Sequence, residues 1–132
     1  NASRKEAFDA HMANYNSSLF DSVSFEQLSL FKEMLKTMQK MDMRVILVRL
    51  PIFDLLYEIE EKKVPDFNSL MENLAEELDV RYVDLNSKMD SVTEDPLHFT
   101  DGSHLEMGST ELVTKQLVEE LAEFGFFRTE KN

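Results

Sequence analysis

The apolar positions of the chain follow a helical period in three separate stretches. In residues 24–41, apolar side chains recur every three or four positions, as on one buried face of a helix. These side chains are Phe25, Leu28, Phe31, Leu35 and Met38. Ser24, followed three residues later by Gln27, has the spacing of a helix N-terminal cap. The same period returns in residues 66–78 and at about 106–124, so we predict three helices.

The third helical stretch carries its own end signal. Gly125 follows the last apolar position and suits the left-handed residue that commonly ends a helix. The side chains that we expect to face inward are Leu105, Leu112, Val113, Leu117 and Leu121.

Two other stretches have the pattern of strands. Residues 43–50, MRVILVRL, are apolar on both faces, which is typical of a strand buried in a parallel sheet. Residues 80–85, VRYVDL, predict a shorter strand, and the polar residues 86–96 predict a loop. Residues 52–64 are ambiguous, with a short helix as one reading. The order helix, strand, helix, strand, loop, helix predicts an α/β fold, with a small parallel sheet flanked by helices.

Composition favours one compact unit. The chain has 132 residues, 42% of them hydrophobic, which suffices for a single domain or subdomain over residues 1–132. Residues 1–20 have only a weak helical pattern, and we expect a loosely packed arm there. The net charge of −12 argues against nucleic acid and anionic membrane surfaces as partners. The longest apolar run, VILVRLPIF, is far shorter than the ~20 residues that span a membrane, so we expect no membrane insertion.

Asp101 and His104 are the candidate catalytic residues. They stand three positions apart in a polar turn after the second predicted strand, and loops at the carboxyl ends of parallel strands commonly carry ligand sites. A carboxylate that binds one imidazole nitrogen leaves the other free to take a proton from a serine hydroxyl. The structural alternative is an Asp-Gly turn followed by a histidine at a helix entry.

A metal site is a weaker alternative for the same loop. Asp101, His104, His98 and Asp95 are metal-ligating residue types, but their spacing matches no strong zinc signature. The chain has no Cys, so it has neither thiolate ligands nor disulfides. We expect no metal and no cofactor, and we interpret His98 and His11 as ordinary surface or loop histidines.

Residues 100–117, TDGSHLEMGSTELVTKQL, resemble the last conserved block of the SGNH, or GDSL-type, hydrolase superfamily: D-x-x-H-L, a glycine and a helix. The order of elements resembles the second half of that family's flavodoxin-like three-layer sandwich. The resemblance implies that Asp101 is the orienting acid and His104 the general base of a serine esterase or acyltransferase. It also implies that Gly108 lets the last helix pack closely. Glu106 stands where relatives often have Asn, Ser or Thr, and its carboxylate could still cap the helix.

The front half of the family pattern is missing. The family's nucleophile lies in a G-D-S turn, with Gly and Asn as oxyanion donors, whereas the three glycines of this chain all lie at Gly102 or beyond. Asn14 and Asn16 are only weak candidates for the Asn. We therefore interpret the chain as the carboxyl-terminal part of an SGNH-like domain whose nucleophilic serine lies elsewhere, and expect no ester hydrolysis by the chain alone.

The resemblance also suggests substrates and a location. Relatives act on acyl groups of lipids or cell-surface polysaccharides, which points to an extracytoplasmic or cell-envelope setting. The alternative function is a non-catalytic SGNH-like scaffold or binding domain, since a fold does not dictate function. A receiver-like domain is disfavoured because no acidic cluster follows a first strand.

We also expect the chain to associate with a second chain, because of the strand at residues 45–50. In the SGNH sheet, the matching strand has neighbours on both sides, and this chain supplies only one of them. We therefore expect an open apolar edge, and a homodimer or swapped assembly through this strand or through the first 20 residues.

Overall fold

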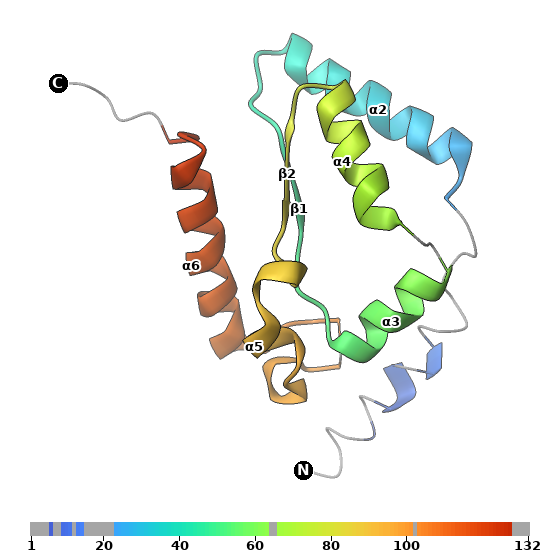
Figure 1. Cartoon of the computed structure of the whole chain (residues 1–132), viewed down its shortest axis with the longest axis vertical. Coiled ribbons are helices and arrows are strands. Elements are labelled where there is room, and N and C mark those ends of the chain that lie inside the picture. Colours follow the sequence, from blue (N-terminus) through green and yellow to red (C-terminus); the bar gives the residue numbers. More distant parts are fainter. Residues whose placement is uncertain are drawn as a thin grey trace, which may run out of the picture.

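A small parallel sheet lies between helices. The computed structural model describes residues 6, 9–11, 13–14, 23–63, 66–101 and 103–127. Strands β1 (Ile46–Arg49) and β2 (Arg81–Asp84) pair in parallel, with Ile46 opposite Arg81. Helix α6 (Met107–Glu123) lies on one side of the strands, and α2 (Phe25–Lys40) and α4 (Phe67–Glu77) lie on the other (Figure 1). The predicted small parallel sheet with flanking helices is confirmed.

The alternation of side chains along the strands explains the two helical layers. Leu47 of β1 packs with the cluster that Leu35 of α2 forms with Leu74 and Leu78. Its neighbours Ile46 and Val48 point to the opposite face, where they pack against Val83, Leu85 and Val113. A strand that is covered on both faces needs apolar residues at consecutive positions, which accounts for the continuous run in this strand.

The predicted helices are confirmed, with small changes at their ends. Ser24 caps α2, because its hydroxyl accepts a hydrogen bond from the backbone N–H of Gln27 at 3.3 Å. Gly125 adopts a φ of 63° just after α6, as expected of a helix-ending glycine. The ambiguous stretch at 52–64 contains helix α3 (Asp54–Lys63).

Two side chains that we expected to be buried are exposed. Phe25 is 86% exposed and Leu112 is 49% exposed. Phe25 lies in the first turn of α2, where no described element packs over it, and Leu112 precedes the buried Val113 on α6 but faces solvent. The helical period predicted both helices correctly, but it wrongly assigned these two residues to the buried face.

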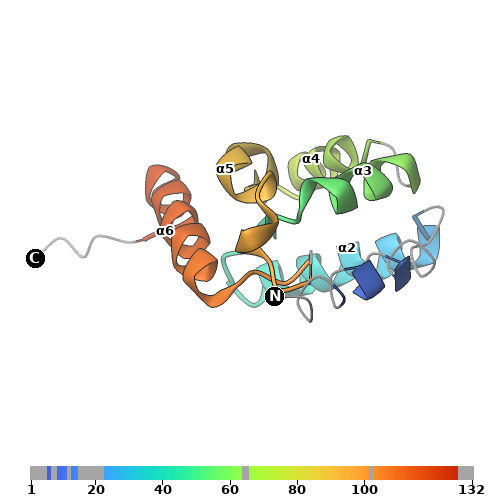
Figure 2. The ribbon, with the colours of Figure 1, turned by 90° about the horizontal axis from the view of Figure 1, so that it is seen from below.

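The predicted loop at 86–96 is more ordered than expected. It contains the short helices η1 (Asn86–Lys88) and α5 (Asp90–Thr93), and η2 (Pro96–His98) begins at its end. Asn86 is buried, and its side-chain oxygen accepts a hydrogen bond from the backbone N–H of Ile52 at 2.8 Å. Figure 2 shows α5 on the same side of the molecule as α3 and α4, with α2 along the opposite side. Most of the expected arm at residues 1–20 lies outside the described residues.

Candidate functional site

A closed hairpin carries the Asp/His pair beyond the carboxyl end of β2. Phe99 and Leu105 form an antiparallel bridge, and the backbone N–H of Thr100 donates to the carbonyl of His104 at 2.7 Å. Phe99 is 1% exposed and packs with Phe53 and Val92, which anchors the hairpin to the core. The turn between these contacts therefore has a rigid base.

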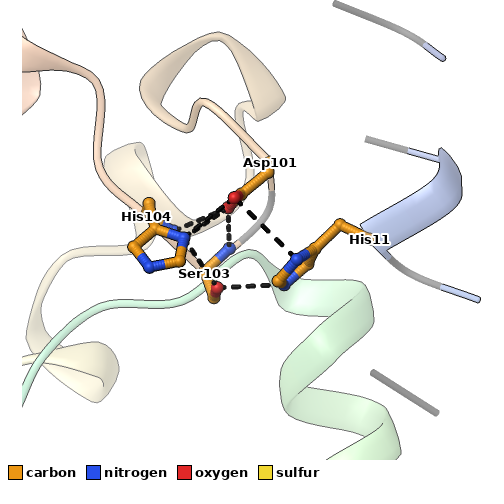
Figure 3. A network of polar contacts seen from close by, with 4 residues as sticks. All are labelled: His11, Asp101, Ser103 and His104. Atoms are coloured by element: carbon orange, nitrogen blue, oxygen red, sulfur yellow. Dashed lines mark hydrogen bonds and ion pairs between the residues drawn. The ribbon is translucent and has the colours of Figure 1, made fainter. Parts of the chain in front are cut away.

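Within this turn, Asp101 and His104 contact each other directly. Nδ1 of His104 lies 2.8 Å from Oδ2 and 2.9 Å from Oδ1 of Asp101. The backbone N–H groups of His104 and Ser103 also donate to Oδ1, at 3.0 and 3.3 Å. In Figure 3 the second ring nitrogen of His104 lies on the side away from Asp101. The His104 side chain is 74% exposed, so this nitrogen can reach a group from outside the hairpin.

These contacts stabilise the ionised form of Asp101. Partial burial alone would raise the pKa of its carboxyl group. The hydrogen bonds from the His104 side chain and from the backbone of His104 and Ser103, together with the charge of His11, outweigh burial and lower the pKa below its usual value. Asp101 is therefore an acceptor that holds the Nδ1 proton of His104.

His11 belongs to the same network and is not the ordinary surface or loop histidine that we predicted from the sequence. Its Nε2 lies 3.0 Å from the hydroxyl of Ser103, and its Nδ1 lies 3.8 Å from Oδ2 of Asp101 (Figure 3). The second distance is too long for a hydrogen bond but close enough for a charge interaction. Ninety-two positions separate His11 from Ser103, and no spacing in the sequence signals the contact.

His98 is also more than a surface histidine. Its Nδ1 lies 2.7 Å from the hydroxyl of Ser109, which is 3% exposed in the first turn of α6. This bond ties the hairpin to the helix that follows it. The carboxylate of Glu106 caps the same helix by accepting from the backbone N–H of Gly108 at 2.8 Å, so the expected cap is present.

Gly108 does not have the packing role that the resemblance implies. It is exposed, and a Cβ at this position would meet only the Glu106 carboxylate, at 3.2 Å. The absence of a side chain at Gly108 leaves space for the capping carboxylate of Glu106, and no other described helix or strand packs against this position. Of the weak oxyanion candidates, Asn14 is exposed and Asn16 lies outside the described residues.

The metal alternative has no support in the described part of the chain, where no three His, Asp or Glu side chains gather as metal ligands would. Asp95 accepts from the backbone N–H of Leu97 at 2.8 Å, as the cap of η2, and so has a structural role. Among the described helices, none is long and apolar enough to cross a membrane.

Comparison with known proteins identifies no relative of this chain. No protein-family model matches the chain, and neither the curated proteins nor the solved structures contain a match. The geometry of the site is therefore the basis for a functional assignment.

Proposed function

We propose that this chain supplies the acid and the base of a serine-dependent acyl-transfer site of the SGNH type, while the nucleophilic serine comes from outside the chain. The observation that carries the proposal is the pairing of His104 Nδ1 with the Asp101 carboxylate at 2.8 Å. This contact selects the imidazole form in which Nε2 carries a lone pair. The exposure of the His104 ring supports access for a serine hydroxyl.

The proposed reaction moves one proton back and forth. His104 Nε2 takes the proton of the serine hydroxyl while the serine oxygen bonds to the acyl carbon. Asp101 stabilises the resulting imidazolium. The imidazolium then returns the proton to the departing alcohol oxygen, which leaves an acyl-serine. Water or an acceptor alcohol repeats these steps and releases the acyl group as an acid or as a new ester.

The substrate class follows from the resemblance. We propose an acyl ester of a lipid or a polysaccharide, acted on in the cell envelope without a metal or cofactor. Ser103 is not assigned as the nucleophile, because its hydroxyl lies 3.3 Å from His104 Nδ1, the nitrogen that is bound to Asp101.

Fluorophosphonate labelling, read by intact mass, tests the proposal on a longer protein that contains these residues. We expect the protein to label, and His104→Ala to label roughly 10³-fold more slowly or worse. Ser91→Ala is the control, because Ser91 is an exposed serine of α5 outside the turn that holds the site, and this variant should label at the unaltered rate. If neither the protein nor its variants label, the catalytic proposal is wrong, and the non-catalytic scaffold takes its place.

A further inference from the structure

Strand β1 has one free edge in the described part of the chain. The carbonyl of Arg49 accepts from the backbone N–H of Leu85 at 3.0 Å, so Arg49 directs its backbone groups toward β2. Successive residues of a strand point their backbone groups in opposite directions, so Leu47 also faces β2, whereas Ile46 and Val48 face away. The sheet has only two strands, β1 and β2, among the described residues. Ile46 and Val48 therefore present two N–H donors and two carbonyl acceptors at an edge.

An apolar groove runs along this edge. It has a volume of about 630 Å³ and includes residues whose side chains belong to opposite faces of β1, such as Leu47 and Val48. Phe31 of α2 and Met71 of α4 form part of its wall. Consecutive residues of β1, namely Ile46, Leu47 and Val48, line the groove, so it follows the strand whose outer edge is free among the described residues.

Helix α2 extends this apolar surface. The side of α2 that carries Lys32 and Gln39 contacts α4, where Lys32 pairs with Glu77 and Gln39 donates to the carbonyl of Leu78. Phe31 lies about 100° around the helix from Lys32, where it packs with the cluster of Leu35 and Leu74 and also lines the groove. Residues of a helix are about 100° apart, which places Leu30 and Met34 next to Phe31 and further from α4. These two side chains are 64% and 44% exposed, and we call them the α2 stripe.

We propose that β1 and the α2 stripe form the interface of a homodimer with a second copy of this chain. A two-fold axis at Leu47 would place Ile46 opposite Val48 of the second copy, and Val48 opposite Ile46 of the second copy. Both pairs have outward backbone groups, so each pair exchanges two hydrogen bonds in an antiparallel arrangement. The edge is thus complementary to itself.

A dimer needs more contact area than the edge of β1 provides. A stable interface buries roughly 1,200–2,000 Å² in total, more than a strand of four residues can provide. The two-fold axis that joins the β1 edges also brings the two copies of α2 to the same face of the joined sheet. The α2 stripe then packs against its own copy and supplies the remaining apolar area.

Sedimentation velocity over a range of protein concentrations tests the dimer. We expect the unaltered chain to dimerise, and Leu30→Glu to raise the dissociation constant by about tenfold or more, because it buries a charge at the interface. Leu112→Glu is the matched control, since Leu112 is a comparably exposed leucine on α6, on the opposite face of the sheet, and adds the same charge. This control should dimerise like the unaltered chain.

A second variant tests the strand edge itself. Val48→Pro removes an outward N–H and leaves the hydrogen bonds of Arg49 and Leu47 to β2 in place, as is tolerated on edge strands. We expect a folded monomer, with folding verified by circular dichroism. A monomeric unaltered chain overturns the proposal and leaves the edge for a strand of another polypeptide. A dimer that Leu30→Glu leaves intact, or that Leu112→Glu disrupts, overturns it equally.

Discussion

Both carboxylate oxygens of Asp101 contact the imidazole of His104 and so orient the ring. The same carboxylate accepts from the imidazole of His104 and from two backbone N–H groups of its own turn. The backbone bonds fix the carboxylate, and the carboxylate in turn fixes the ring. An Asp three positions before a histidine thus both closes the turn and contacts the imidazole. An Asp-Gly turn and the proposed catalytic pair are therefore compatible and not alternatives.

We predict that Asp101→Asn changes the tautomer of neutral His104. With Asp101, the proton should reside on Nδ1, because a carboxylate only accepts hydrogen bonds there. The Asn side chain can turn its NH₂ group toward Nδ1, which would favour the form with the proton on Nε2. Long-range ¹H–¹⁵N spectra of the imidazole distinguish the two forms. Asp95→Asn is the control in the same loop, and an unchanged tautomer in Asp101→Asn would refute the prediction.

At the scale of elements, an ion pair between an exposed lysine and a buried carboxylate fastens α6 to the segment after β2. Glu120 is 6% exposed, and its carboxylate accepts from Lys88 of η1 at 2.6 Å. The hydrogen bond to Lys88 lowers the pKa of Glu120, and it outweighs the opposite effect of burial. Together with the bond between His98 and Ser109, this pair holds α6 beside the hairpin that carries the site.

We predict that Lys88→Ala lowers the free energy of unfolding by about 1–3 kcal/mol at neutral pH, because it leaves a buried carboxylate without its cation. A lowered pKa stabilises the fold above the unfolded value of about 4.3, and this stabilisation is lost as the pH falls through the folded value. The difference between the variant and the unaltered chain should therefore shrink below about pH 4. Urea unfolding at several pH values measures it.

Lys36→Ala is the matched control for the ion pair. Lys36 pairs with Glu33 at 3.2 Å on the exposed surface of α2, where such pairs contribute under about 1 kcal/mol. Equal losses of stability in the two variants would contradict a special role for Lys88.

Across the whole molecule, the sequence predicted the elements better than their contacts. Period and composition located α2, β1, α4, β2 and α6, because burial on one or both faces sets the order of apolar residues. The place of Asp101 and His104 followed from their position after the second strand. The contact between Ser103 and His11 had no local signal, since it joins segments that are distant in the chain. The exposure of Phe25 and Leu112 depends on which elements pack nearby, and a helical period does not contain that information.

A polar network that joins four elements was equally hidden in the sequence. Asn68 of α4 accepts from Arg49 of β1 at 2.9 Å and from the hydroxyl of Tyr82 of β2 at 2.7 Å, and donates to Asp84 at 2.9 Å. Arg49 is 9% exposed and also binds Glu60 of α3 at 2.8 Å. Burial and the neighbouring charge of Asp84 raise the pKa of Tyr82 to about 12, so its hydroxyl stays a donor. Asn68 can bind the donors Arg49 and Tyr82 and the acceptor Asp84 at the same time, because an amide accepts at its oxygen and donates at its nitrogen.

We predict that Asn68→Leu lowers the free energy of unfolding by about 2–5 kcal/mol. Leucine has a similar size but leaves three partly buried polar groups without this partner, and each such group costs about 1–3 kcal/mol, in part recovered by water. Asn73→Leu is the matched control, because Asn73 is exposed on the same helix and should change stability by less than about 0.5 kcal/mol. Urea unfolding compares the two variants. Equal stability would mean that water replaces Asn68 without loss, and that apolar packing alone holds the four elements together.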